Sequence, residues 1–197
     1  MSGLEGAPAI LWVGRLNANK DPLTILEGFD QSVAQLPNAR LTMIYSSEDL
    51  LPAVQARVRA SATLRTRVRL AGRVAHHLMP AFYSAADIFV LGSHHEGSGY
   101  ALMEALACGV AAVVTDIPTF RVITADGSLG ALWTSGDAGS FARALLDVGQ
   151  RDVAACRAPI VDRFERELSW PAIGRQAMLA YRDIVARRHV GLGQGAR

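Results

Sequence analysis

The feature that most constrains the fold of this chain is a regular alternation of short apolar runs with longer helical patterns. Six runs of four to six residues read as buried strands: residues 9–13, 40–45, 68–71, 87–91, 110–115 and 130–134. Helical patterns, most of them ten residues or longer, separate them. This alternation predicts right-handed crossovers and an α/β fold, a Rossmann-like parallel sheet of about six strands with helices on both faces.

The helical patterns complete the expected organisation. They cover residues 22–34, an arginine-rich segment that follows Asp49 and ends near Ser61, residues 78–85 and 98–108, a short piece after Thr119, residues 138–148, a segment beginning near 152, and a last helix that starts after Pro171 and ends near Arg188. A chain of 197 residues that is half apolar suffices for one domain with a sizeable core. We therefore expect one domain over residues 1–188 and a loose, glycine-rich tail over 189–197.

Composition excludes several classes of function. The net charge of +2 argues against a nucleic-acid-binding protein. The apolar runs are too short to span a membrane, and the first residues lack the basic start and apolar core of a signal peptide. Two cysteines, Cys108 and Cys156, are too few for a disulfide framework, which fits a cytoplasmic setting.

The stretch over residues 91–116 carries the most unusual chemistry. Glu104 lies within a helix that is apolar on nearly every side, and Glu96 lies just before that helix. Burying an unpaired neutral polar group typically costs about 2–7 kcal/mol, and burying an unpaired carboxylate costs more. No basic residue stands one helical turn from Glu104. Either a distant basic residue or a ligand with hydroxyl donors therefore satisfies it.

Two loops offer places for an anion. Gly97-Ser98-Gly99 begins a helix whose free N–H groups favour negative charge, although a G-x-G alone is weak evidence and an ordinary turn with Ser98 as the N-cap is the simpler interpretation. Met103 stands where a dinucleotide fingerprint needs its third glycine. Arg15 and Lys20 share the loop after the first strand and together could neutralise a diphosphate, or they form a solvated surface pair.

Other chemistry has little support in the sequence. The doublets at positions 76–77 and 94–95 are histidines, but neither they nor the cysteines have the spacing of metal ligands, so no metal site is expected. No nucleophile-elbow motif is present. Trp12, Trp133 and Trp170 are most simply core residues.

These motifs resemble those of a known family. Glu96-Gly97-Ser98-Gly99, followed by Glu104 to Gly109, resembles the E-G-F-G-x-x-x-x-E-A-x-A-C-G signature of family 4 retaining glycosyltransferases. Gly14-Arg15-Leu16 with Lys20 resembles that family's G-R-L…K element. Gly72-Arg73-Val74 and the later Gly136-Asp137 are similar to further elements in the same order. The resemblance covers about residues 9–150.

The resemblance implies one half of a GT-B enzyme, the C-terminal domain that binds a nucleotide diphosphate sugar without metal or cofactor. Arg15 and Lys20 would hold the diphosphate, Glu96 the transferred sugar and Glu104 the ribose hydroxyls. Arg15, Lys20 and Glu96 are the expected catalytic residues. The expected donor-binding residues are Gly14, Arg73, Val74, Gly97, Ser98, Gly99, Tyr100 and Glu104.

Several positions depart from the family pattern. Ser98 replaces an aromatic residue, Gly92 replaces a proline, and Ser46-Ser47 replaces a pair of glycines. The proline that often follows the cysteine-glycine pair is absent, as is an acidic residue near position 121. The chain also lacks anything that corresponds to the family's N-terminal acceptor-binding domain. The final helix is therefore expected to dock on that missing half, and peripheral membrane association is expected of the full-length enzyme.

Two other functions remain open at this stage. The first is a standalone, non-catalytic module that binds a sugar nucleotide or phosphate. The second is an epimerase or phosphorylase of similar architecture, although Lys20 is the only lysine that could bind pyridoxal phosphate. The base, the sugar and the acceptor are not specified by the sequence.

Overall fold

The computed structural model of the protein describes residues 4–193, and the side chains up to Val185. Within this part of the chain, six strands form one parallel sheet in the order β3-β2-β1-β4-β5-β6. The strands are β1 (Ala9–Gly14), β2 (Arg40–Tyr45), β3 (Val68–Gly72), β4 (Ile88–Leu91), β5 (Ala111–Thr115) and β6 (Gly130–Trp133). This confirms the Rossmann-like fold and all six expected strands, each within one residue at either end.

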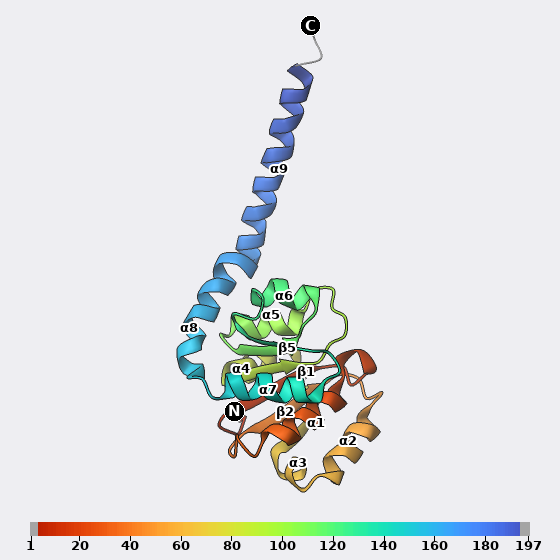
Figure 1. Ribbon diagram of the computed structural model, residues 1–197. Helices are drawn as coiled ribbons and strands as arrows, with labels where there is room; N and C mark the ends of the chain where they lie inside the picture. The colour runs from red at the N-terminus through yellow and green to blue at the C-terminus, as the bar shows by residue number, and fades with distance from the viewer. Residues whose placement is uncertain (1–3, 194–197) are drawn as a thin grey trace.

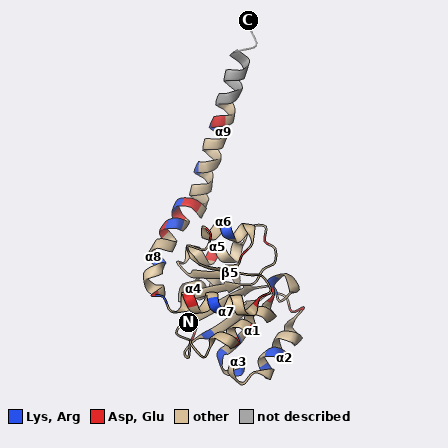
Figure 2. Ribbon diagram, viewed as in Figure 1, with Lys and Arg blue, Asp and Glu red and all other residues tan. Residues whose placement is uncertain are grey.

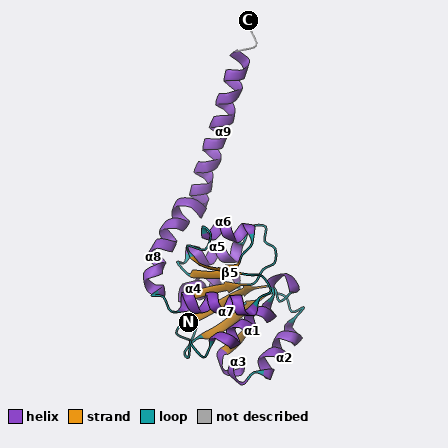
Figure 3. Cartoon of the chain, viewed as in Figure 1, coloured by secondary structure: helices purple, strands orange, loops and turns teal. Residues whose placement is uncertain are grey.

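Helices cover both faces of the sheet (Figures 1 and 3). The α-helices are α1 (Pro22–Ser32), α2 (Leu51–Ala60), α3 (Ala62–Arg67), α4 (Met79–Ala85), α5 (Tyr100–Ala107), α6 (Pro118–Thr124), α7 (Ala138–Gly149), α8 (Val153–Arg163) and α9 (Trp170–Gly193). Short 3-10 turns are η1 (Ala18–Lys20) and η2 (His76–Leu78), and η3 (Phe164–Leu168) is a π-helical turn. Helix α1 packs with α2, α3 and α7 on one face, while α4, α5 and α6 lie against the other.

The strand order explains where a ligand site should form. β1 pairs in parallel with both β2 and β4, so the chain moves outward from β1 in one direction and then returns to the other side. The loops after β1 and β4 therefore diverge to opposite faces of the sheet. The opening between them at the carboxyl ends of the strands is where ligands bind in folds of this type.

Local sequence signals fix the helix that leaves β1. Asp21 caps α1 by accepting a hydrogen bond from the Thr24 N–H at 3.3 Å, and Pro22 stands at the first helical position. Asp21 has a positive φ of 41°, which turns the chain sharply between η1 and α1. Lys20 is thereby held at the end of the loop that follows β1.

The helical region after β2 differs from the expected one. The expected helix ending near Ser61 is α2, which begins at Leu51, but a second helix, α3, follows it. Ser61 has an extended backbone and its side chain accepts from the Leu64 N–H at 3.2 Å, so it ends one helix and caps the next. Both helices carry arginines and no acidic residue (Figure 2).

The final helix leaves the body of the protein. α9 extends away from the sheet in Figure 1 and continues to Gly193, where we expected it to end near Arg188; residues 194–197 lie outside the described residues. Trp12 and Trp133 are buried as expected, but Trp170 is 78% exposed on α9, so its assignment to the core is wrong. None of the helices within residues 4–193 combines the length and apolarity that crossing a membrane requires.

Candidate functional site

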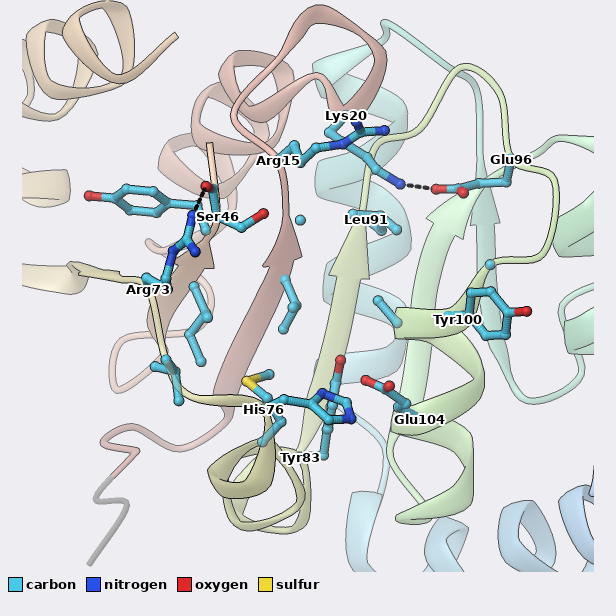
Figure 4. A pocket seen from close by; sticks show the side chains of 18 of the residues that line it. Arg15, Lys20, Ser46, Arg73, His76, Tyr83, Leu91, Glu96, Tyr100 and Glu104 are labelled. Carbon is cyan, nitrogen blue, oxygen red and sulfur yellow. Dashed lines mark hydrogen bonds and ion pairs between the residues drawn. The ribbon is translucent and has the colours of Figure 1, made fainter. Parts of the chain in front are cut away.

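A pocket of about 540 Å³ opens at the carboxyl ends of β1, β2 and β4. Its floor is made by strand ends, including Val13, Ile44 and Leu91. All of the site residues expected from the sequence line this pocket except Gly97, which lies in the same loop (Figure 4). The fold therefore brings together residues that are up to 90 positions apart in the chain, from Gly14 to Glu104.

The loop after β1 supplies the basic rim of the pocket. Arg15 follows β1 directly and is exposed, whereas the Lys20 side chain is only 13% exposed. Figure 4 shows both cations on the same rim, next to the loop that carries Glu96. A Cβ added to Gly14 would lie 3.1 Å from the Trp12 ring and 3.5 Å from the Lys20 side chain, so glycine leaves room for both residues there.

Lys20 and Glu96 form an ion pair across the pocket rim. The Lys20 ammonium donates to Glu96 Oε1, and the Glu96 side chain is also only 13% exposed. Ser93 Oγ donates to the same carboxylate oxygen at 2.7 Å, and Thr119 Oγ1 donates to the Glu96 carbonyl at 2.7 Å. Since both side-chain contacts use Oε1, the second carboxylate oxygen is left for a ligand.

Glu104 has different surroundings at the other end of the pocket. The ion pairs found within residues 4–193 do not include it. The Tyr83 hydroxyl points toward its carboxylate in Figure 4, but the two groups do not meet hydrogen-bond geometry. Burial, and next the charge of Glu104, raise the pKa of Tyr83 above its ordinary value of 10.0. The sequence left two possible partners for Glu104, a distant basic residue or a ligand with hydroxyl donors. The distant basic residue is not observed within the described residues.

The glycine loop leads directly into the amino end of α5. Gly99, and not Ser98, is the N-cap, and no side chain caps the helix. Gly99 has a φ of 61°, and a Cβ there would lie 3.0 Å from the Ile123 side chain. Ser98, Gly99 and Tyr100 line the pocket, although the Tyr100 side chain is 65% exposed and its ring extends outward (Figure 4). The uncapped first-turn N–H groups of α5 are therefore available to an anion.

The loop after β3 forms the opposite wall. Arg73 and Val74 line the pocket, and the Arg73 guanidinium donates to the Ser46 carbonyl at 2.9 Å (Figure 4). This bond joins the loop after β3 to the end of β2. Arg73 and Val74 line the same pocket as Arg15.

Several pocket residues were not identified from the sequence. Tyr45, Ser46, His76, Met79 and Tyr83 also line the pocket. Ser46 directly follows a strand, so its position at the carboxyl end of β2 was a usable signal. Tyr83 lies within α4 and reaches the pocket only because that helix packs beside α5, which no local pattern reveals.

Comparison with known proteins identifies related sequences. The family described as Glycosyl transferases group 1 matches residues 7–150. Mannosylfructose-phosphate synthase from Agrobacterium fabrum is 36% identical over 120 residues, which cover 57% of this chain and 26% of that protein. The chain spans between 26% and 47% of the length of the first curated relatives that it matches.

Two solved structures show the same fold. Anabaena HepE, in complex with UDP and glucose, superposes with a TM-score of 0.74 at 17% identity and covers 88% of this chain and 48% of its own. The C-terminal domain of a glycosyl transferase group 1 family protein from Francisella tularensis superposes with a TM-score of 0.71 at 22% identity, over 82% of this chain and 86% of its own. The family match extends over most of the chain, and the chain therefore belongs to the group 1 glycosyl transferases.

Proposed function

We propose that this chain is the donor-binding domain of a retaining glycosyltransferase that uses a nucleoside diphosphate sugar. The observation that carries the proposal is the gathering of Arg15, Lys20, Glu96 and Glu104 around one pocket with the amino end of α5. Two cations and free helix N–H groups suit a diphosphate, while two carboxylates suit hydroxyl groups. The UDP and glucose bound by HepE support this assignment.

Each charged residue has a place in the proposed complex. The diphosphate lies between Arg15, Lys20 and the start of α5, which stabilise the departing nucleoside diphosphate without a metal ion. Glu96 accepts a hydrogen bond from a hydroxyl of the transferred sugar through its second carboxylate oxygen. Glu104 accepts hydrogen bonds from the ribose hydroxyls, which gives partners to a carboxylate that has no ion pair in the described part of the chain. The base lies along the wall formed by Arg73 and Val74.

The proposed reaction is a front-face displacement at the anomeric carbon. In such a displacement the acceptor hydroxyl attacks from the side on which the nucleoside diphosphate leaves, so the configuration is retained. The phosphate oxygen of the leaving group takes the acceptor proton as its bond to the anomeric carbon breaks. Arg15 and Lys20 stabilise the negative charge that develops on the diphosphate. A second domain binds the acceptor. This fits a chain that spans less than half of the length of its first curated relatives.

Helix α9 belongs to the same proposal. Its exposed apolar side chains include Trp170, Met178, Leu179, Tyr181 and Ile184. We expect the acceptor-binding domain to cover them in the complete enzyme, because large exposed apolar patches typically mark interaction sites. Removing residues 170–197 should therefore leave nucleotide affinity unchanged. A loss of affinity in this truncated chain would show that α9 serves the pocket instead.

Calorimetric titration of the chain with UDP, GDP and ADP tests the donor site. At least one should bind, and failure of all three at millimolar concentration would contradict the proposal. The ribose assignment has its own test with Glu104→Ala. The wild-type chain should prefer the nucleoside diphosphate over its 2′-deoxy form, and the variant should bind the two alike. A preference that survives the substitution would exclude Glu104 as the ribose acceptor.

A further inference from the structure

Asn19 joins the loop after β1 to the loop after β4 through three hydrogen bonds. The Asn19 carbonyl accepts from the His94 N–H at 2.8 Å. The Asn19 side-chain oxygen accepts from the His95 N–H at 3.0 Å, and its side-chain nitrogen donates to the His95 carbonyl at 3.0 Å. Asn19 thus uses one backbone group and both ends of its amide to hold two consecutive residues of the other loop.

This clamp stands immediately beside the charged pair. Lys20 follows Asn19 in the chain, and Glu96 follows His95, so each clamped residue precedes one member of the ion pair. The two loops also touch at Gly92, where an added Cβ would lie 3.2 Å from the carbonyl oxygens of both Lys20 and Asp21. The separation between the loops is therefore fixed on both sides of the Lys20–Glu96 pair.

Asparagine is suited to this role by its chemistry. Its amide presents one acceptor and two donors, which complement the N–H and C=O of a single residue on a neighbouring backbone. Aspartate would accept from the His95 N–H but would turn a carboxylate oxygen toward the His95 carbonyl. Alanine would offer neither group. A lysine side chain with four rotatable methylene groups otherwise has much conformational freedom to lose when it binds a phosphate.

We propose that Asn19 is a positioning residue for the diphosphate site: it holds the loop of Lys20 at a fixed distance from the loop of Glu96. The proposal rests on the function proposed above. Asn19 does not line the pocket, so it acts through Lys20 and not by contact with the nucleotide. Replacing Asn19 by alanine removes both side-chain bonds and keeps only the backbone bond from His94, so the loop is held more loosely and the ligand must order more of the ammonium's motion.

The test is a double-mutant cycle measured by calorimetry with whichever of UDP, GDP and ADP binds the wild-type chain. Asn19→Ala should weaken binding about tenfold, within the range of coupling between neighbouring residues. In a Lys20→Met background the same substitution should have almost no further effect, since there is no ammonium to position. Asn19→Asp, which keeps one of the two side-chain bonds, provides a second variant if Asn19→Ala does not fold.

Asp30→Ala is the matched control. Asp30 also joins two segments through two side-chain bonds, accepting from Arg57 at 2.9 Å and from Ser61 Oγ at 2.9 Å, but none of these three residues lines the pocket. It should lower thermal stability to a similar extent without changing nucleotide affinity. If the wild-type chain binds nucleotide and the Asn19 variants bind equally well, or if the Asn19 and Lys20 effects simply add, the positioning role is wrong while the donor site stands. If the wild-type chain binds none of the three nucleotides, the donor site itself is wrong and the positioning role fails with it.

Discussion

The loop before α5 and the second turn of α5 each present a carboxylate to the pocket, yet the two carboxylates have different neighbours. Glu96 in the loop is bound by the Lys20 ammonium and the Ser93 hydroxyl. Glu104 in the helix faces the Tyr83 hydroxyl and has no ion pair within the described residues. Within the described residues, a cation therefore compensates the charge of the first carboxylate but not that of the second.

This difference indicates how each group changes when a ligand enters. A diphosphate must compete with Glu96 for the Lys20 ammonium, so that pair has to loosen or share its cation. A ribose brings hydroxyl donors to Glu104, which gains partners and loses none. Substitutions at the two carboxylates and at their neighbours distinguish these two responses to a ligand.

Replacing Lys20 by Met should weaken nucleoside diphosphate binding about 100-fold, because a hydrogen bond between charged groups contributes roughly 1.5–3 kcal/mol. It also leaves Glu96, which is 13% exposed, without its cation and closer to the phosphates. Calorimetry measures the change. Arg59→Met, which removes an exposed charge on α2, is the control and should bind as the wild type does; equal losses in both variants would point to a general charge effect.

Gly99→Ala should lower the free energy of unfolding by about 1–3 kcal/mol, the cost of holding a side chain in a sparsely populated backbone region. Gly99 has a φ of 61° and its Cβ would lie 3.0 Å from Ile123. Chemical denaturation reports the loss. Gly97→Ala in the same loop meets no atom within 4 Å and should change stability by less than about 0.5 kcal/mol. An equally stable Gly99→Ala protein would mean that the start of α5 adapts freely.

Replacing Glu96 and Glu104 separately by glutamine should shift the affinity for a nucleoside diphosphate in opposite directions. Glu96→Gln removes a negative charge beside the phosphates and releases Lys20, so a nucleoside diphosphate without sugar should bind severalfold more tightly. Glu104→Gln weakens the acceptor for the ribose and should reduce affinity about tenfold, which corresponds to about 1.4 kcal/mol. Calorimetry on both variants measures the pair of shifts. Changes of the same sign would contradict the distinction between the two carboxylates.

The smallest expected effect concerns Tyr83 and pH. Burial and the Glu104 charge raise the pKa of Tyr83 in the folded protein, so the fold favours the protonated hydroxyl. Its contribution to stability is fully present below the unfolded pKa of about 10 and is lost as pH rises from there toward the folded value. Denaturation between pH 9 and 11 should show a steeper loss for the wild type than for Tyr83→Phe. Parallel profiles would mean that Tyr83 does not contribute.

Much of the fold was predictable because each strand and most helices carry a local signal. The six apolar runs and the cap formed by Asp21 and Pro22 depend only on neighbours in sequence. Where two local signals compete, the prediction was less accurate. Ser61 ends α2 and caps α3, and the continuous arginine-rich pattern concealed that break. Gly99 replaces Ser98 as the N-cap because the chain needs a positive φ there.

Most of the charged residues that line the pocket could be predicted from the sequence, but the contacts between them could not. Strand ends meet at one edge of a parallel sheet, and this rule places the loops with Arg15, Arg73 and Glu96 around one site. The Lys20–Glu96 ion pair joins residues 76 positions apart, and no local pattern indicates it. The exposure of Trp170 was equally hidden, because a tryptophan in a sequence indicates burial whether or not another part of the chain covers it.

A crystal structure of the chain with the best-binding nucleoside diphosphate tests the central claim most directly. We predict the diphosphate between Arg15, Lys20 and the amino end of α5, with the ribose hydroxyls within hydrogen-bond distance of Glu104. The Lys20–Glu96 contact should lengthen as the ammonium turns to the phosphates. A nucleotide bound outside this pocket, or bound within it with its ribose away from Glu104, would contradict the account.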